Sequence, residues 1–552
     1  MNNKRPNILW ISFEDTSPRY GCYGDPVAVS PNVDRLAAGG CRWPNAFSTA
    51  GVCAPSRMSI ITGIHAISGG GHHMRTGHCN RHTPEMPTPY GAVIPHYVKC
   101  FPEYLRAAGY YCTNNEKCDY QFDPPVTAWD ECSKDAHWRN RPDPEQPFFA
   151  VFNPMFTHES GQWETDVPDA WTEAGAAHEQ WKDVAKPVRP EEVTVPPYLP
   201  DTLRTRAAIA RQYNNIQRDD ALMGRLLDEL EEDGLLENTI VFHWSDHGEG
   251  LPRAKRWPYD QGIHVPLVVR APGITAPGSV NPDLVSLIDL GPTVLSLCGA
   301  PIPRHMQGRP FLGPQSRPRQ YVFASRDRFD ESYDMMRACR DERFKYIRNF
   351  YPDRAYSQWV PYRNRHPAMQ ELWKLAAEEG LQPPQDLLLR NSRPPEELYD
   401  TREDPWELNN LAADPEYQNT LERLRQACGQ WRDEVNDLGD LDESVMRNRM
   451  WGNSEEPPQT TAPILIALGE GQSGQDPVVD GETFEHPVLL QMHTPTQGAS
   501  MAWTLESGAD VRWRLYTGPL KLPSGQHTLR MKAIRIGYRE SEERTLTVTC
   551  PG

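Results

Sequence analysis

The chain has 552 residues, of which 38% are hydrophobic and 24% are charged, so it holds enough apolar material for a large buried core and is not disordered throughout. It carries 57 basic and 75 acidic residues, a formal net charge of −18. A surface this acidic repels nucleic acid and anionic membranes at long range, which excludes both as general partners. An anionic substrate would therefore need a local cluster of cations.

The number and spacing of the cysteines and the composition of the first residues indicate the cellular compartment of the protein. The 12 cysteines form no close-paired Cys-x-x-Cys arrays, which argues against a disulfide scaffold and against a zinc ribbon. The first apolar run ends at Phe13 and is shorter than a signal-peptide core, and no stretch approaches the ~18 apolar residues of a membrane span. We expect a cytoplasmic protein without a membrane partner, or a periplasmic or secreted one if a leader has been removed.

The first part of the chain alternates strand and helix patterns. Residues 7–13 are apolar on both faces, as in a parallel strand covered by helices. Thr202 is a suitable N-cap for a helix with 3.6-residue periodicity that runs to about Leu236, and a strand follows at 239–242. Further elements follow at 265–269 and 284–297. The pattern predicts an α/β domain over 1–330 with polar residues gathered at strand ends, where open parallel sheets bind ligands.

The pattern changes at about residue 330. Residues 321–324 and 344–347 are typical of strands in a smaller antiparallel sheet, and a helix is predicted at 415–435. We assign residues 331–450 to a smaller α+β subdomain. Residues 451–478 are rich in Pro, Gly, Gln and Ser, and are predicted to be a linker.

The tail, residues 479–552, is all-β in character. Five stretches separated by turn-forming clusters predict a β-sandwich accessory module, at 488–492, 501–505, 511–516, 527–536 and 544–549. The strings Thr517-Gly518-Pro519-Leu520 and Ala533-Ile534-Arg535-Ile536-Gly537-Tyr538 resemble the C-terminal module of chitobiase-like hexosaminidases. Glycan binding and a packing role without a ligand are both compatible with this resemblance.

The most specific motif is Cys53-Ala54-Pro55-Ser56-Arg57. It resembles the signature of type I sulfatases of the alkaline-phosphatase superfamily, and the similarity continues through most of residues 5–435. The resemblance implies an alkaline-phosphatase-like fold, a mixed, largely parallel sheet between helices, and a partner maturase that oxidises Cys53 to formylglycine. In that family the hydrated aldehyde attacks sulfur and expels the alcohol, which is covalent catalysis. Arg57 is expected to stabilise the nucleophile and the acidic metal ligands.

Two acidic pairs after strands resemble the metal ligands of that family. Glu14-Asp15 follows the first strand, with Glu14 where the family usually has Asp, and Asp246-His247 follows the strand at 239–242. Carboxylate ligands suit Ca²⁺, which takes six to eight oxygens, whereas His247 would also suit a transition metal. We expect calcium, held by these four residues.

Three basic residues resemble the sulfate-binding groups of the family. Lys255 opens a Lys-x-x-x-Tyr-x-x-Gly-x-x-Val-Pro pattern, and Lys117 follows a stretch at 105–110 that is similar to the family. His158 follows the strand at 148–152, and the resemblance implies that it contacts sulfate and protonates the leaving alcohol. Together these groups would stabilise the charge that grows as the S–O bond breaks.

The sequence departs from the family at Asp119. A histidine usually stands there as the base for sulfate release, so either Asp119 replaces it or a histidine from elsewhere does, with His65, His72 and His73 as candidates. The glycine-rich string at 69–75, which carries His72, His73 and Arg75, is predicted to be a flexible, basic loop that contacts the substrate.

The substrate class is suggested by residues 351–395, which combine aromatic residues with arginines such as Arg363. Aromatic faces stack on sugar rings, and guanidinium pairs with sulfate or carboxylate. This favours a sulfated saccharide, whether a glycosaminoglycan, an algal polysaccharide or an oligosaccharide, carrying an O-sulfate or, as in sulfamidases, an N-sulfate. Two other hypotheses remain: a phosphonate monoester or phosphodiester hydrolase of the same superfamily, and an inactive glycan-binding protein.

Overall fold

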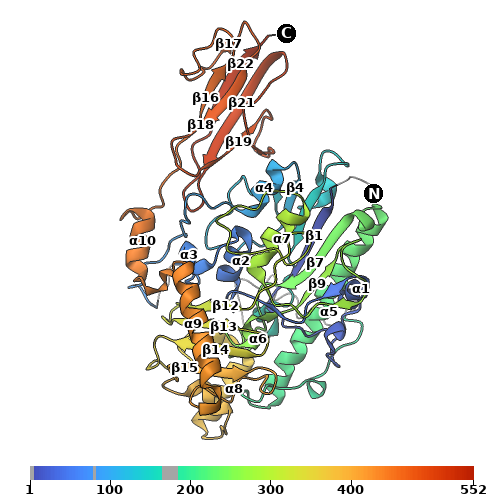
Figure 1. The fold of residues 1–552 in the computed structure, drawn as a ribbon, viewed down its shortest axis with the longest axis vertical. Coiled ribbons are helices and arrows are strands. Elements are labelled where there is room, and N and C mark those ends of the chain that lie inside the picture. Colours follow the sequence, from blue (N-terminus) through green and yellow to red (C-terminus); the bar gives the residue numbers. More distant parts are fainter. Residues whose placement is uncertain (1–4, 79–81, 165–183, 552) are drawn as a thin grey trace.

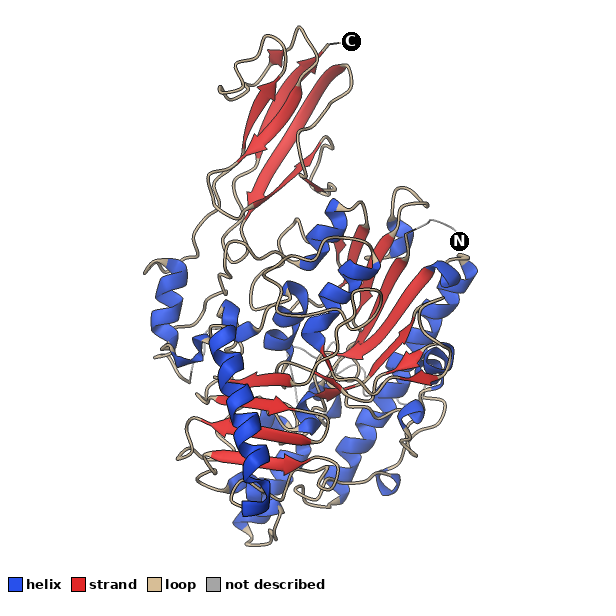
Figure 2. Cartoon of the chain, viewed as in Figure 1, coloured by secondary structure: helices blue, strands red, loops and turns tan. Residues whose placement is uncertain are grey.

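The computed structural model describes residues 5–78, 82–164 and 184–551. They form a large α/β body, a smaller α+β part packed on it, and an all-β module that projects from the body at the C-terminal end (Figures 1 and 2). The predicted fold class is confirmed. Within the described ranges no helix combines the length and the apolar character that crossing a bilayer requires.

The body is built on an eight-stranded sheet in the order β10-β2-β9-β7-β1-β6-β4-β5. Its strands are β1 (Asn7–Phe13), β2 (Cys41–Arg42), β4 (Tyr111–Asn115), β5 (Glu131–Cys132), β6 (Phe148–Phe152), β7 (Thr239–Ser245), β9 (Leu267–Arg270) and β10 (Ser279–Val280). The central strands β7, β1, β6 and β4 are parallel, and β9 is antiparallel to β7. Every residue of β1, β6 and β7 is buried, which explains their continuous apolar sequences.

Helices cover both faces of this sheet. Alternate residues of β1 enter two different hydrophobic clusters, one shared with α2 (Cys53–Thr62), α4 (Phe101–Ala107) and α7 (Leu290–Leu297), the other with α1 (Pro31–Gly39) and α5 (Leu203–Glu232). Thr202 caps α5 as predicted, because its hydroxyl accepts the backbone N–H of Thr205 at 3.2 Å. The sheet is thus sandwiched, and its strand ends are left to carry polar residues.

The smaller part is an antiparallel sheet in the order β12-β13-β14-β15, with bounds Val322–Arg326, Met336–Arg340, Phe344–Asn349 and Glu396–Asp400. Helix α9 (Gln418–Glu434) lies across it (Figure 1) and shares a hydrophobic cluster with it. Helix α8 (Pro367–Ala377) packs on α5, and a small sheet of β3 (Ala46–Phe47), β8 (His264–Val265) and β11 (Val285–Ser286) adjoins the body. Further short helices among the described residues are α3 (Ala66–Gly69) and α6 (Asp260–Ile263), from the chain of the body, and α10 (Glu443–Trp451), which follows α9.

The C-terminal module pairs β16 (Ile464–Leu468) with β18 (Leu489–His493) and adds a five-stranded sheet in the order β17-β22-β21-β19-β20, with bounds Glu482–Thr483, Arg544–Cys550, Gly525–Ile534, Ser500–Thr504 and Arg514–Leu515. The two sheets enclose a hydrophobic core of their own. Strand β16 lies inside the predicted linker 451–478, so the linker is shorter than predicted. Only alternate residues of β16 are buried, and this short alternation stands next to a Gly- and Ser-rich stretch.

Candidate active site

Two parallel strands deliver acidic residues to one point at the carboxyl edge of the sheet. The last residues of β1 and β7 pair with each other, so the residues that follow them emerge side by side. These are Glu14 and Asp15 after β1, and Asp246 and His247 after β7, and all four are fully buried. The backbone N–H of Asp15 donates to Asp246 Oδ1 at 3.3 Å. Asp15, Asp246 and His247 therefore form one cluster with Cys53, and Glu14 belongs to an overlapping cluster with Asp15, Cys53 and His158.

Cys53, the first residue of α2, lies against this cluster and is only 2% exposed. Its Sγ is 3.2 Å from His247 Nε2, 3.8 Å from Glu14 Oε2 and 3.9 Å from Asp15 Oδ1. Ligand atoms of Asp15, Cys53, Asp246 and His247 all lie within 4.8 Å of one another. Carboxylate oxygens that converge in this way are a donor set for a hard cation.

Two lysines neutralise the carboxylates that follow β1. Lys117 Nζ is 2.6 Å from Glu14 Oε2, and Lys255 Nζ is 2.6 Å from Asp15 Oδ2 and 3.3 Å from Glu159 Oε1. Burial raises the pKa of Asp15, but Lys255, His247 and His158 together outweigh it and hold that pKa well below the usual value. Asp15 is therefore ionised in spite of its burial.

Arg57 neutralises the carboxylate that follows β7. Its Nε donates to Asp246 Oδ2 at 3.0 Å, its Nη1 donates to Asn153 Oδ1 at 3.1 Å, and its Nη2 forms an ion pair with Glu14. Burial raises the pKa of Asp246, but His247 and Arg57 outweigh burial, and the net pKa is lowered to about 2. Arg57 thus connects the ends of β1, β6 and β7 in one network.

Glu159 and Arg256 belong to the same site, and the sequence reasoning did not assign either. Arg256 donates two hydrogen bonds to Glu159, at 2.8 and 2.6 Å, and the backbone N–H of Glu159 donates to Asp15 Oδ2 at 2.7 Å. Burial raises the pKa of Glu159, but Arg256 and Lys255 bring it below its usual value. Glu159 directly follows His158, and Arg256 directly follows Lys255, both of them predicted site residues. This adjacency is the signal that could have revealed Glu159 and Arg256.

His158 reaches the site from the segment after β6. Its Nδ1 accepts the backbone N–H of Ser160 at 3.4 Å and lies 2.9 Å from the Ser160 hydroxyl, an arrangement that leaves the proton on Nε2. Burial and the nearby Lys255 lower the pKa of His158 to about 3. The free enzyme therefore holds a neutral imidazole with an N–H donor at Nε2.

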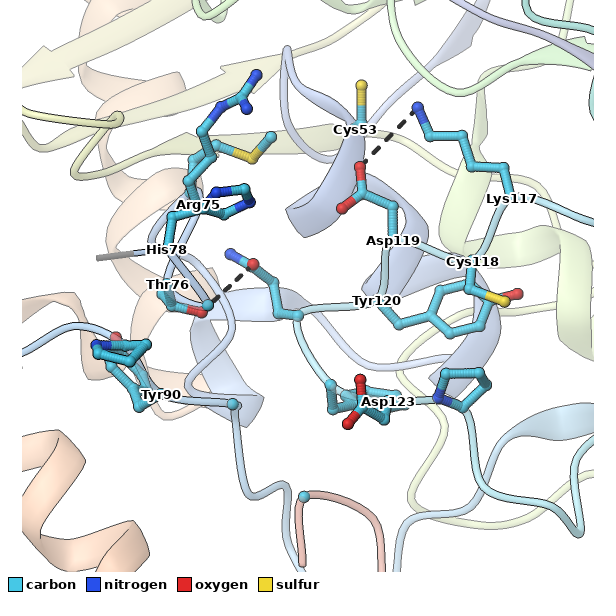
Figure 3. Close-up of a pocket in the computed structure, with 18 of the residues that line it drawn as sticks. Cys53, Arg75, Thr76, His78, Tyr90, Lys117, Cys118, Asp119, Tyr120 and Asp123 are labelled. Carbon is cyan, nitrogen blue, oxygen red and sulfur yellow. Dashed lines mark hydrogen bonds and ion pairs between the residues drawn. The ribbon is translucent and has the colours of Figure 1, made fainter. Parts of the chain in front are cut away.

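The site opens into a cavity of about 1030 Å³ that has Cys53 in its wall. Figure 3 shows Cys53, Lys117 and Asp119 converging at one end, with Arg75 across from Lys117. Lys117 Nζ and Asp119 Oδ2 are 4.0 Å apart. His158 and Lys255 also line the cavity. Asp119 therefore lies near Lys117 in the wall of the cavity that Cys53 also lines, and the roles assigned to these residues remain predictions.

The prediction of a flexible, substrate-contacting loop at 69–75 is wrong for His72 and His73. They are 3% and 5% exposed, neither lines the cavity, and His73 Nδ1 accepts the backbone N–H of Arg328 at 3.2 Å. The glycines serve close packing rather than flexibility, because a Cβ at Gly71 would lie 2.0 Å from the sulfur of Met58. His65 is also buried, packed against a tryptophan.

Arg75 and Arg363 differ in their placement. Arg75 lines the cavity, with its Nε 2.8 Å from Asp330 Oδ1 and its guanidinium over the ring of Tyr362. Arg363 is 4% exposed and does not line the cavity, so the prediction that it contacts substrate is wrong. Burial and the neighbouring Arg256 lower the pKa of Arg363 to about 9. Its neighbour Tyr362 faces the cavity in its place.

Comparison with known families agrees with this geometry. The family described as Sulfatase matches residues 6–137 and 113–300, which together span more than half of the chain. The family described as N-sulphoglucosamine sulphohydrolase, C-terminal, matches residues 248–374. These matches cover the α/β body and the first part of the smaller sheet region.

Whole-chain comparisons point the same way. The chain is 41% identical to an ulvan-active sulfatase of Formosa agariphila over 98% of this chain and 91% of the relative, and 26% identical to human N-sulphoglucosamine sulphohydrolase over 78% and 90%. Among solved structures, a 2-O GAG sulfatase matches with a TM-score of 0.56 at 20% identity, covering 81% of this chain and 96% of that one. Phosphonate monoester hydrolase of Agrobacterium radiobacter shares the fold with a TM-score of 0.53 at 18% identity, covering 79% and 97%. The chain therefore belongs to the sulfatase family of sulfuric ester hydrolases.

Proposed function

We propose that this sulfatase removes sulfate from a sulfated polysaccharide of the ulvan kind. The relative that supports this substrate is named an ulvan-active sulfatase and aligns with 98% of the chain. The observation that carries the proposal is the cavity of about 1030 Å³ with Cys53, Lys117, Lys255 and His158 in its wall. A cavity of this size lies at the upper end of the range of roughly 300–1,000 Å³ for ligand sites, which suits a saccharide better than a small aryl ester.

The proposal includes Ca²⁺ and the conversion of Cys53 to formylglycine, and the charges of the site fit both. Four buried carboxylates face four basic side chains, so a bound divalent cation would make the net charge of this group positive. The carboxylates are those of Glu14, Asp15, Asp246 and Glu159, and the basic residues are Lys117, Lys255, Arg57 and Arg256. A positive site attracts a sulfate ester even though the whole chain carries −18. When present, the calcium ion supplies Lewis acidity and the formylglycine supplies an oxygen nucleophile.

Lys117 and Lys255 bind the sulfate group in this account. Each ammonium is anchored 2.6 Å from a buried carboxylate, so neither needs to reorganise when the substrate arrives. Fixed charges in a water-poor site stabilise the transition state more than mobile, hydrated ones. Their function is to hold the sulfur next to residue 53 and to offset the charge on the sulfate oxygens.

His158 serves the leaving alcohol. Its neutral imidazole presents Nε2–H, because Nδ1 already accepts from Ser160. An anionic sulfate ester next to this ring raises the pKa of His158 from about 3, so a larger fraction of the complex holds the imidazolium that can give its Nε2 proton to the leaving oxygen. In this proposal Asp119, 4.0 Å from Lys117, accepts a proton when sulfate is released.

Cleavage of an N-sulfate is the second candidate. The observation that favours it is the match of residues 248–374 to the C-terminal family of N-sulphoglucosamine sulphohydrolase. That segment contributes Lys255 and Arg256 to the cavity wall. O-sulfated and N-sulfated saccharides must therefore be tested side by side.

The test is sulfate release from a panel of ulvan, O-sulfated and N-sulfated glycosaminoglycan oligosaccharides. The protein is co-expressed with a formylglycine-generating maturase, and peptide mass spectrometry measures the conversion of Cys53. The proposal predicts release from ulvan at a higher kcat/KM than from the N-sulfated saccharides. Release from N-sulfated saccharides alone would establish the second candidate, and hydrolysis of aryl phosphodiesters without sulfate release would contradict both.

A further inference from the structure

Part of the cavity wall comes from the C-terminal module rather than from the catalytic body. Ile534, the last residue of β21, lines the same cavity as Cys53 and Lys255, and so do Tyr538 and Arg539 in the turn that follows. The family matches end at residue 374, so this wall lies outside the regions that they cover. A module that was only a packing or tethered domain would have no need to reach the catalytic cavity.

The module is docked firmly enough to hold this wall in place. Ile536 belongs to the main hydrophobic cluster of the catalytic body and is 5% exposed. Gly537 has φ +83°, and a Cβ there would lie 2.3 Å from the carbonyl oxygen of Ala92, so the two backbones touch. Farther along the contact, Lys99 Nζ donates to Ser500 Oγ at 2.9 Å.

The turn contributes Tyr538, Arg539 and Glu540 to the cavity wall, and Lys532 neutralises the Glu540 carboxylate by donating to it at 2.6 Å. The guanidinium of Arg535 lies 4.5 Å from the centre of the Tyr538 ring and donates to its hydroxyl at 3.0 Å, which fixes the ring. The backbone of Arg539 is pinned on both sides, since its N–H donates to Pro458 at 2.8 Å and its carbonyl accepts from Thr460 at 2.9 Å. Its side chain is exposed. Within the described residues, its one ion pair is with the surface carboxylate of Glu456, at 2.9 Å.

We infer that the turn at 534–540 is a subsite for a second sugar unit of an anionic oligosaccharide, apart from the unit that loses sulfate. Tyr538 stacks on the sugar ring, as aromatic side chains do on apolar C–H faces. Arg539 pairs with a carboxylate or sulfate on that unit through a charge-assisted hydrogen bond. The inference rests on the proposed function, and it adds that the C-terminal module selects for chain length.

The experiment compares two substrates on full-length, matured protein: an aryl sulfate, which has no second sugar unit, and a purified ulvan oligosaccharide. For Tyr538→Ala and for Arg539→Ala we expect KM on the oligosaccharide to rise about tenfold, with kcat/KM on the aryl sulfate within twofold of wild type. Tyr538→Phe keeps the ring and should retain the wild-type KM. Arg544→Ala is the charge-matched control, because Arg544 lies on β22 and does not line the cavity.

Two results would overturn the subsite. An unchanged KM on the oligosaccharide in both alanine variants would show that the turn makes no contact with the substrate. An equal loss on both substrates would show that the turn only supports the fold. A wild-type enzyme that cleaves the aryl sulfate but no saccharide would instead contradict the proposed function, and the subsite with it.

Discussion

Replacing Lys255 by methionine tests the charge arrangement of the site most sharply. The substitution keeps the length of the side chain but removes an ammonium 2.6 Å from Asp15 and 3.3 Å from Glu159. Removal of one partner from a buried ion pair costs about 3–5 kcal/mol of stability, because the other charge remains buried. Loss of a fixed charge that stabilises the transition state costs a further factor of about 10²–10³ in kcat.

The assay separates the two effects with a matched control. Lys345 is also fully buried and also bridges two carboxylates, Asp260 and Glu407, in the smaller part of the protein. Lys345→Met should lower the melting temperature as Lys255→Met does, yet keep kcat/KM for sulfate release within a few-fold of wild type well below that temperature. Equal kcat/KM for the Lys255 variant and the wild type would refute the reasoning.

Further predictions concern the proton donor, the metal ligands, acid stability and the module. His158→Gln should lower kcat/KM by about 10²–10⁴-fold. Because the pKa of His158 is about 3, a plot of wild-type kcat/KM against pH should show no inflection from this residue between pH 5 and 7. Asp246→Asn should weaken calcium binding, measured by calorimetry, by more than about 100-fold together with the rate, and unchanged calcium affinity would argue against this ligand. Burial lowers the pKa of His366 to about 3, below the value of ~6.5 in the unfolded chain. The unfolded state therefore binds one more proton in acid, and the free energy of unfolding falls by about 2 kcal/mol between pH 7 and pH 5. His366→Asn should make the melting temperature less sensitive to this change, and an unaltered sensitivity would contradict the assignment. Gly537→Ala should loosen the module, because it combines φ +83° with the contact to Ala92, and faster proteolysis near residues 452–463 would report it.

The central part of the fold could be predicted from local patterns. Strands β1 and β7 have continuous apolar sequences because helices cover both of their faces, and α5 has a clear period with a threonine cap. Strand β16 was missed because only alternate residues of it are buried, and its partner β18 lies some 20 residues farther along the chain. Pairing between distant segments leaves little trace in local composition.

The site residues likewise divide into those that the local sequence marks and those that only tertiary packing decides. Cys53 and the acidic pairs could be predicted because a motif marks the first and strand ends mark the others. His72 and Arg363 were predicted to face the substrate from their residue types, but tertiary packing buries both. The contribution of Tyr538 to the cavity depends on docking between segments more than 400 residues apart, which no local pattern records.

The most direct test of the account is sulfate release from ulvan by matured wild-type protein and by Cys53→Ala, measured in parallel with and without calcium. The account predicts release by the wild type only, in proportion to the fraction of residue 53 converted to formylglycine and reduced when calcium is removed. Wild-type turnover by Cys53→Ala, or no release from any sulfated saccharide by fully converted protein, would contradict it.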